Sequence, residues 1–175
     1  MVSRINSGLM SSNNGEWETP QAFFDRLDAE FGFNLDAAAS PENAKCDVYC
    51  TKEDDTFDFC WSGTVWLNPP YGREIIRFVE KAYIESVTGA TVVVLVPART
   101  DTRWWHDYVM KADEIRLVRG RLRFVGALSS APFPSAVAIF RPRTIAEMDR
   151  MPRLGVMDAL APSPDVAERR KGAGR

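Results

Sequence analysis

The sequence of 175 residues predicts one α/β domain, a compact three-layer sandwich with a mostly parallel sheet and a terminal antiparallel pair of strands. Apolar runs with strand character alternate with segments of helical periodicity through most of the chain. Two of the strands stop at proline, which cannot donate to a ladder, so both are expected to end at the same edge of the sheet. The hydrophobic fraction of 45% is ordinary for a globular protein with its own core.

The first predicted helix begins at Thr19 and Pro20 and ends at Gly32. Threonine is a frequent N-cap, proline suits the first turn, and glycine often follows the last helical residue. Apolar side chains recur at helical spacing inside these limits, at Phe23, Phe24, Leu27 and Phe31. Residues 33–36 are predicted to form a short strand that leads into three alanines and Ser40.

The middle of the chain contains the two clearest strands. Residues 64–67 are predicted to form a buried strand, and residues 91–96 a central parallel strand covered on both faces. Between them, residues 74–87 have the apolar spacing of an amphipathic helix, which Gly89 ends. The preceding segment, 41–62, has no clear periodicity beyond a short candidate strand at 47–50 and an acidic loop.

The last part of the domain is predicted to contain a helix over 102–112 and two strands that pair antiparallel at one edge of the sheet. These strands are 115–124, interrupted near Gly120, and 135–141. After Pro142 the pattern weakens, with one short helix expected within 144–160. The predicted organisation is therefore a flexible N-terminal lead over 1–16, a domain over 17–142 and a partly disordered C-terminal extension over 143–175.

Composition and motifs exclude several classes of protein. With 3 cysteines that lack paired spacing and a single histidine, His106, a metal site is not expected. No apolar stretch reaches the length of a membrane span, and the first 15 residues lack the apolar core of a signal peptide, so we expect a cytoplasmic protein without a membrane partner. Neither a glycine-rich phosphate loop nor a Ser-His-acid set is present in the sequence.

The most informative stretch is Asn68-Pro69-Pro70-Tyr71, directly after the strand at 64–67. Ligands of open α/β sheets bind at the carboxyl ends of the strands. The Asn68 side-chain oxygen and the Pro69 carbonyl can accept hydrogen bonds from an exocyclic amine, which frees the nitrogen lone pair for attack. The Tyr71 ring can stack on a planar base. These residues suit a planar amine substrate, and the alternative is a rigid loop with Tyr71 packed on its own prolines.

These residues, with others in the same order, resemble the phage-type DNA adenine methyltransferase family. The resemblance runs from about Trp17 to Arg141, and its matching segments are 17–20, 35–40, 68–72, 97–102, 120–124 and 131–133. It implies a Rossmann-like methyltransferase fold, S-adenosylmethionine as cofactor and methyl transfer to the 6-amino group of adenine in DNA. It also implies a phage or prophage enzyme that acts in the host cytoplasm.

The resemblance implies that the segments on either side of the first helix bind the cofactor. Thr19 would contact its carboxylate end, and the residues assigned to the cofactor are Trp17, Thr19, Pro20, Asp36, Ala37, Ala38, Ser40 and Asn68. As alternatives, Thr19 serves as a helix cap and Asp36 as a turn residue at the strand end. In the cofactor loop, alanines and Ser40 stand where methyltransferases usually have glycines. Asn68 follows Asp36 by only 32 positions, which is short for two strand–helix units, so one or more of these units must be reduced. The acid for the cofactor ribose stays open among Asp47, Glu53, Asp54 and Asp55.

A net charge of −2 means that DNA must be bound through a local basic patch. We expect phosphate contacts from four arginines: Arg99, Arg103, Arg121 and Arg123. They belong to a basic cluster, expected to bind DNA, that also contains Arg116 and Arg119. Phe133, which lies between two prolines, is the preferred second stacking contact for a flipped adenine, and Phe124 is expected to pack in the core. No separate recognition domain is visible in the sequence, so specificity must come from loops or a partner chain; the oligomeric state is left open.

Two other functions agree with parts of this pattern. Enzymes that methylate glutamine amides of proteins use the same four-residue motif on another planar amine, although they usually carry a glycine in the cofactor loop. A DNA-binding module that has lost catalysis could keep the same cleft as a base pocket. The intact Asn68 and Tyr71 argue against this second alternative.

Overall fold

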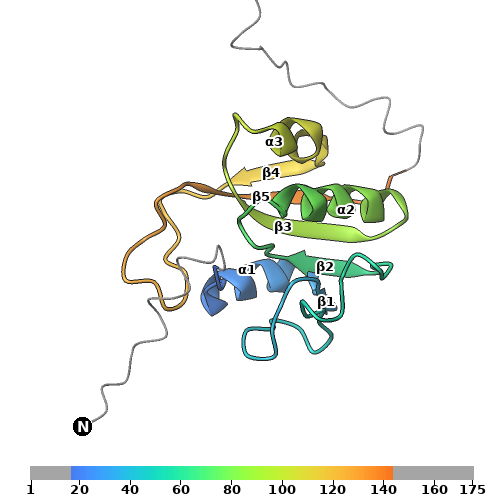
Figure 1. The fold of residues 1–175 in the computed structure, drawn as a ribbon, viewed down its shortest axis with the longest axis horizontal. Helices are drawn as coiled ribbons and strands as arrows, with labels where there is room; N and C mark the ends of the chain where they lie inside the picture. The colour runs from blue at the N-terminus through green and yellow to red at the C-terminus, as the bar shows by residue number, and fades with distance from the viewer. Residues whose placement is uncertain (1–16, 144–175) are drawn as a thin grey trace, which may run out of the picture.

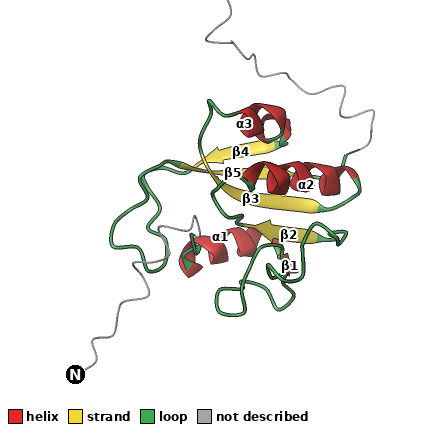
Figure 2. Ribbon diagram, in the orientation of Figure 1, coloured by secondary structure: helices red, strands yellow, loops and turns green. Residues whose placement is uncertain are grey.

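The structure, a computed structural model, describes residues 17–143. Its centre is an open five-stranded sheet in the order β1-β2-β3-β5-β4 (Figures 1 and 2). The strands are β1 Leu35–Asp36, β2 Thr64–Leu67, β3 Thr91–Pro97, β4 Glu114–Leu117 and β5 Ser135–Phe140. The first three are parallel to one another, and β5 is antiparallel to both of its neighbours. The predicted mixed sheet with a terminal antiparallel pair is therefore confirmed.

Three helices accompany the sheet: α1 Gln21–Phe31, α2 Ile75–Val87 and the short α3 Arg103–Asp107, which is followed by a 3₁₀ turn at Val109–Lys111. None of the helices within the described range is long and apolar enough to cross a membrane. All six residues of β5, and six of the seven in β3, are buried, because both faces of these strands are covered. This burial makes β3 and β5 the centre of the core.

Helix α1 covers one face of the sheet, which the strand register identifies. Trp66, Val93, Ile139 and Glu114 pair in one row across four strands, so their side chains share a face. The Phe24 ring of α1 meets the Trp66 ring edge to face, with centroids 5.6 Å apart. Helix α2 joins the parallel strands β2 and β3 and contacts β3 and β5, so it covers the opposite face (Figure 1).

The strand directions bring several loops to one edge of the sheet. β1, β2 and β3 all end at this edge because they are parallel. The reversed β5 begins there, with Ser135 opposite Pro97, and β4 ends there. The long connection between β4 and β5 leaves from the same edge, at the left of Figure 1. The predicted convergence of the Asn68 and Pro97 loops is confirmed.

Some predicted elements are shorter than expected. Thr19 is not the helix cap, because Pro20 occupies that position and no side chain caps the helix, whereas Gly32 ends it with a left-handed φ of 62° as predicted. The candidate strand at 47–50 is reduced to one parallel bridge from Tyr49 to Asp36. The helix predicted over 102–112 is split at Tyr108, whose φ and ψ of −130° and −52° lie outside the helical region.

The strand predicted over 115–124 was wrong beyond Leu117. The chain turns at Gly120, which has a φ of 79°, and residues 118–134 form a loop instead. Phe124 and Val125 therefore have no strand partner; Val125 N–H donates to the Glu18 carbonyl at 3.0 Å. The helix predicted within 144–160 lies outside the described residues.

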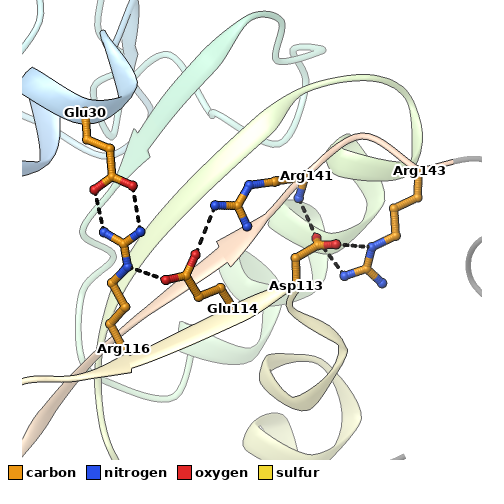
Figure 3. Close-up of polar contacts among 6 residues, drawn as sticks. All are labelled: Glu30, Asp113, Glu114, Arg116, Arg141 and Arg143. Carbon is orange, nitrogen blue, oxygen red and sulfur yellow. Dashed lines mark hydrogen bonds and ion pairs between the residues drawn. The ribbon is translucent and has the colours of Figure 1, made fainter. Parts of the chain in front are cut away.

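A network of ion pairs joins α1 to the outer strand β4 (Figure 3). The Arg116 guanidinium donates two bonds of 2.6 Å to Glu30 and a third of 2.6 Å to Glu114. Glu114 also accepts from Arg141 at 3.0 Å, and the neighbouring Asp113 pairs with Arg143 at 2.6 Å. Each of the three acids accepts more than one hydrogen bond, and surface ion pairs in such networks or bidentate pairs contribute most to stability. Arg116 is therefore a structural residue, although the sequence placed it in a DNA-binding cluster.

We expect Glu114→Gln to lower the free energy of unfolding by about 1 kcal/mol at pH 7, since its side chain is partly exposed and solvent screens the pairs. Hydrogen bonds from Arg116 and then Arg141 hold the pKa of Glu114 at about 2, against an ordinary 4.5. A depressed folded-state pKa means that this stabilisation is present above pH 4.5 and is lost as the pH falls toward 2. Urea unfolding of both proteins between pH 7 and pH 2 measures it, and a difference that stays constant with pH contradicts the expectation.

Candidate active site

The Asn68 side chain, one residue beyond β2, is held in one orientation. Its Nδ2 donates to the Trp17 carbonyl at 2.5 Å. Because a carbonyl can only accept, the amide nitrogen must face Trp17 and the oxygen must face away. This Oδ1 atom is buried and has no hydrogen-bond partner among the described residues. An unsatisfied buried acceptor costs roughly 1–3 kcal/mol, so the site retains an acceptor for a donor that a ligand can supply.

Tyr71 lies in a cluster of four aromatic rings. Its ring meets Phe133 and Phe124 edge to face, at centroid distances of 5.6 and 6.1 Å. The Trp17 ring contacts the same two phenylalanines at 5.3 and 5.1 Å. Phe124 is buried, as predicted, and Phe133 is half-buried. The Tyr71 hydroxyl donates to the Leu95 carbonyl at 3.3 Å, and burial raises its pKa well above the usual value, so it stays protonated.

Three bonds fix the segment before α1 against the site. Besides the Trp17 contact with Asn68, the Glu18 carbonyl accepts from Val125, and the Glu18 carboxylate pairs with Lys45 at 3.3 Å. Thr19, which follows, is 1% exposed, and its hydroxyl has no partner in the described chain. Pro20 is half-buried, and its carbonyl accepts from the first turn of α1. Thr19 thus presents a second buried polar atom without a partner.

Asp36, the last residue of β1, organises the loop that follows. One carboxylate oxygen accepts from the Ala38 N–H at 3.3 Å, and the other accepts from the Lys45 N–H at 3.0 Å. Burial raises the pKa of the carboxyl, while these amides and the Lys45 charge act in the opposite direction. The adjacent Ala37 is buried, and Ala38 and Ser40 are half-buried. Asp36 thus acts as a turn residue through these two hydrogen bonds. It also lies near Asn68, because β1 pairs with β2.

Of the four acids considered for the cofactor ribose, Glu53, Asp54 and Asp55 follow the bridge that Tyr49 forms with Asp36. Tyr49 pairs parallel with Asp36, so residues 51–55 emerge at the same edge, whereas Asp47 precedes the bridge. Asp54 accepts from the Thr51 amide and hydroxyl, and Asp55 accepts from the Phe57 amide. These two carboxylates already stabilise their own loop. Glu53 is exposed.

The four arginines predicted to contact DNA are all exposed. Arg99 follows β3, and Arg121 and Arg123 lie in the 118–134 loop rather than on a strand. That loop contains three arginines and no acidic residue. Arg103 is on α3, where its guanidinium pairs with Asp107 at 2.9 Å. The structure thus brings Arg99, Arg121 and Arg123 to the loops of one edge, while Arg103 is partly neutralised.

Ser135 is a residue that sequence reasoning missed. It is 1% exposed, and its hydroxyl has no hydrogen-bond partner in the described part of the chain. It begins β5 at the edge where Asn68 lies. The only signal in the sequence is a hydroxyl at the start of an otherwise apolar strand. Among the described residues, no group of His, Cys, Asp and Glu side chains could hold a metal ion.

Comparison with known proteins decides the family. The model of the DNA N-6-adenine-methyltransferase (Dam) family matches residues 6–145. The chain belongs to the Dam family. The match covers every site segment described above, from Trp17 to Ser135, so the shared part includes both the acceptor at Asn68 and the 118–134 loop.

Two phage proteins illustrate the similarity. The DNA N-6-adenine-methyltransferase of Escherichia phage T1 is 36% identical over 102 residues, which are 57% of this chain and 42% of the T1 protein. The DNA N-6-adenine-methyltransferase of Haemophilus phage HP1 (strain HP1c1) is 32% identical over 124 residues, 68% of this chain and 71% of the HP1 protein. The matched part of this Dam chain thus corresponds to less than half of the T1 protein and most of the HP1 protein.

We expect Asp36→Ala to destabilise the protein by roughly 1–3 kcal/mol, because the amides of Ala38 and Lys45 lose their acceptor inside the fold. Asp25→Ala is the matched control: Asp25 is exposed on α1 and accepts from one exposed side chain, so its loss should cost less than about 0.5 kcal/mol. Denaturant unfolding of the three proteins compares them. Equal stability of the two variants would show that Asp36 does not organise the loop.

Proposed function

We propose that this chain transfers the methyl group of S-adenosylmethionine to the 6-amino group of adenine in DNA. Membership of the Dam family and the similarity to two phage DNA N-6-adenine-methyltransferases support this function. The observation that carries it is the buried Asn68 oxygen, which has no partner among residues 17–143 while the amide nitrogen is fixed by Trp17. An acceptor without a donor is what an incoming amine requires.

Asn68 acts on the amine by accepting a hydrogen bond from one of its protons. The exocyclic nitrogen of adenine is a weak nucleophile, because its lone pair is delocalised into the ring. The Pro69 carbonyl is the second acceptor that we propose; the Pro70 carbonyl is occupied by the Gly72 amide at 3.0 Å. Together the two bonds favour a pyramidal nitrogen. The cofactor would supply an electrophilic methyl group, so that the nitrogen–carbon bond would form as the sulfur–carbon bond breaks, and the methylated amine would then lose its proton to solvent.

The residues proposed for the cofactor fit its polar groups. The unpartnered Thr19 hydroxyl can donate to a carboxylate, and the loop over Asp36, Ala37, Ala38 and Ser40 lies at the edge beside Asn68. Trp17 and Pro20 flank Thr19. We assign the catalytic domain to residues 17–142, and the strand order, with β5 reversed between β3 and β4, agrees with a Rossmann-like methyltransferase sheet.

Detection of 6-methyladenine tests the proposal directly. The protein is incubated with labelled S-adenosylmethionine and either DNA or a whole-protein extract, and the DNA is digested to nucleosides for mass spectrometry. Label in 6-methyl-2′-deoxyadenosine alone is expected. Label only in protein would indicate a glutamine amide methyltransferase, and the absence of any cofactor binding by calorimetry would indicate a DNA-binding module without catalysis.

We expect Asn68→Ala to reduce methyl transfer at least a hundredfold, because one preorganised acceptor contributes roughly 3 kcal/mol to the transition state. Cofactor affinity should change little, since the cofactor is proposed to lie mainly against Thr19 and Asp36. Single-turnover rates and calorimetry measure the two effects. Retention of more than a tenth of wild-type turnover under saturating conditions would remove Asn68 from the catalytic role.

Two Tyr71 variants separate stacking from hydrogen bonding. Tyr71→Phe keeps the ring contacts with Phe124 and Phe133 and loses only the bond to the Leu95 carbonyl, so we expect a mild loss of activity. Tyr71→Ala should impair both base binding and rate, since stacking contributes roughly 1–3 kcal/mol per base. Methylation kinetics with thermal unfolding as a stability control compare them. Equal loss in the two variants would assign the function to the hydroxyl.

The 118–134 loop is proposed to bind phosphates. We expect Arg121→Ala with Arg123→Ala to weaken DNA binding and to reduce its salt dependence by about one unit per lost contact. Arg26→Ala is the control, an exposed arginine on α1. Fluorescence anisotropy at several salt concentrations gives the slopes. A slope unchanged from the wild type would mean that these arginines are only solvated.

A further inference from the structure

We propose that the Ser135 hydroxyl donates a hydrogen bond to a ring nitrogen of the target adenine, on the side of the base away from Asn68. This inference rests on the proposed function and adds a base-binding residue to it. Among residues 17–143, four buried side-chain atoms have no partner, and three of them, on Thr19, Asn68 and Ser135, lie at the same edge of the sheet. The fourth, on His106, belongs to α3.

Strand register places Ser135 and Asn68 on one face. Ser135 pairs with Pro97, and Val137 pairs with Leu95, so Ser135 shares the face of Leu95. Leu67 pairs with Val94, so the next residue, Asn68, continues in line with Leu95. The bond from Asn68 to Trp17 agrees with this direction, because Trp17 leads into α1, which covers the same face.

Strand order places Asn68 between Asp36 and Ser135. Along the edge, the residues follow the sequence Asp36 on β1, Asn68 after β2, Pro97 on β3 and Ser135 on β5. The cofactor is proposed to lie toward β1, against Asp36 and Thr19. A base whose amine meets Asn68 from the other side must therefore extend toward β5. Two strand spacings and a two-residue offset separate the Cα atoms of Asn68 and Ser135 by about 12 Å, a distance that the two side chains with a planar base between them could span.

The segment that carries Ser135 also contributes to the aromatic cluster. Phe133, two residues before Ser135, contacts the Tyr71 and Trp17 rings. The nearby backbone groups are already used: the Pro134 carbonyl accepts from Ala98, and the Ser135 carbonyl accepts from Val118. The hydroxyl takes part in neither bond, so it does not stabilise the strand.

Adenine offers complementary chemistry to this pair of side chains. Its amine is a donor for the Asn68 oxygen, and its ring nitrogens are acceptors for a hydroxyl proton. A site that hydrogen-bonds a base at two edges discriminates strongly, because a wrong base leaves a buried polar atom without a partner. Ser135 is thereby a specificity-determining residue for adenine.

The experiment pairs Ser135→Ala with base analogues in DNA. Wild type and variant are compared on duplexes that carry adenine, 1-deazaadenine, 3-deazaadenine or 7-deazaadenine at the methylated position, with kcat/KM as the readout. We expect Ser135→Ala to lose about fivefold to tenfold on adenine, the effect of about one hydrogen bond. One analogue should be equally good for the two proteins, because its missing nitrogen already removes the bond. The ratio of the wild-type kcat/KM to the variant kcat/KM on the same duplex cancels any change that the analogue makes in the reactivity of the amine.

Controls separate the possible outcomes. Ser62→Ala, at an exposed position before β2 and at the opposite edge of the sheet from Asn68, should behave as wild type on all four duplexes. Thermal unfolding and calorimetry with S-adenosylmethionine check the fold and the cofactor site of Ser135→Ala. A loss that is the same on every duplex, no loss at all, or a weaker cofactor affinity alone would overturn the assignment. If the wild type formed no 6-methyladenine on the adenine duplex, the proposed function would fail instead.

Discussion

Strand β3 is the constraint on which the arrangement of the site depends. It is paired on both edges, with parallel β2 on one side and antiparallel β5 on the other, and its side chains are buried on both faces. A strand with no free edge and no exposed face cannot shift in register without exposing apolar groups. The positions of Asn68 and Ser135 along the edge therefore follow from the two pairings of β3, and Arg99 follows β3 itself.

Prolines end two of the strands at the edge where the candidate active site lies. Pro69 and Pro70 follow β2, and Pro97 ends β3, so neither strand can continue and the chain leaves the sheet at the same edge after each of them. The Asn68 amide then finds its partner in Trp17, 51 positions earlier in the chain. A segment of irregular structure before α1 is thus fixed by the motif itself, and the Trp17 ring is carried into contact with Phe124 and Phe133.

The sequence predicted the features that depend on local physics. An uninterrupted apolar run specified β3, the proline pair specified the end of β2, and Gly32 specified the end of α1, since each of these signals acts over a few residues. Features that depend on distant contacts could not be predicted. From the sequence, Thr19 fits a helix cap as well as a cofactor contact. Only the fold shows that its hydroxyl does not cap α1 and has no partner in the described part of the chain. Arg116 looks like a DNA contact until Glu30, 86 positions away, is placed beside it. Residues 118–124 have the composition of a strand, but a φ of 79° at Gly120 and the pairing of Val125 with Glu18 take them out of the sheet.

The ion pairs on β4 have a consequence for the behaviour of the protein at high concentration. β4 is the outermost strand on its side, so its outer backbone groups are a template for another chain, and such edges are where sheets join into aggregates. Glu114 and Arg116 are held across this strand by Glu30 and Arg141, and the carboxylates and guanidiniums stay hydrated at the surface. A foreign strand that docked on β4 would have to bring its own side chains against four fixed charges and strip water from them. The same contacts that attach α1 to the sheet thus also discourage the sheet from growing.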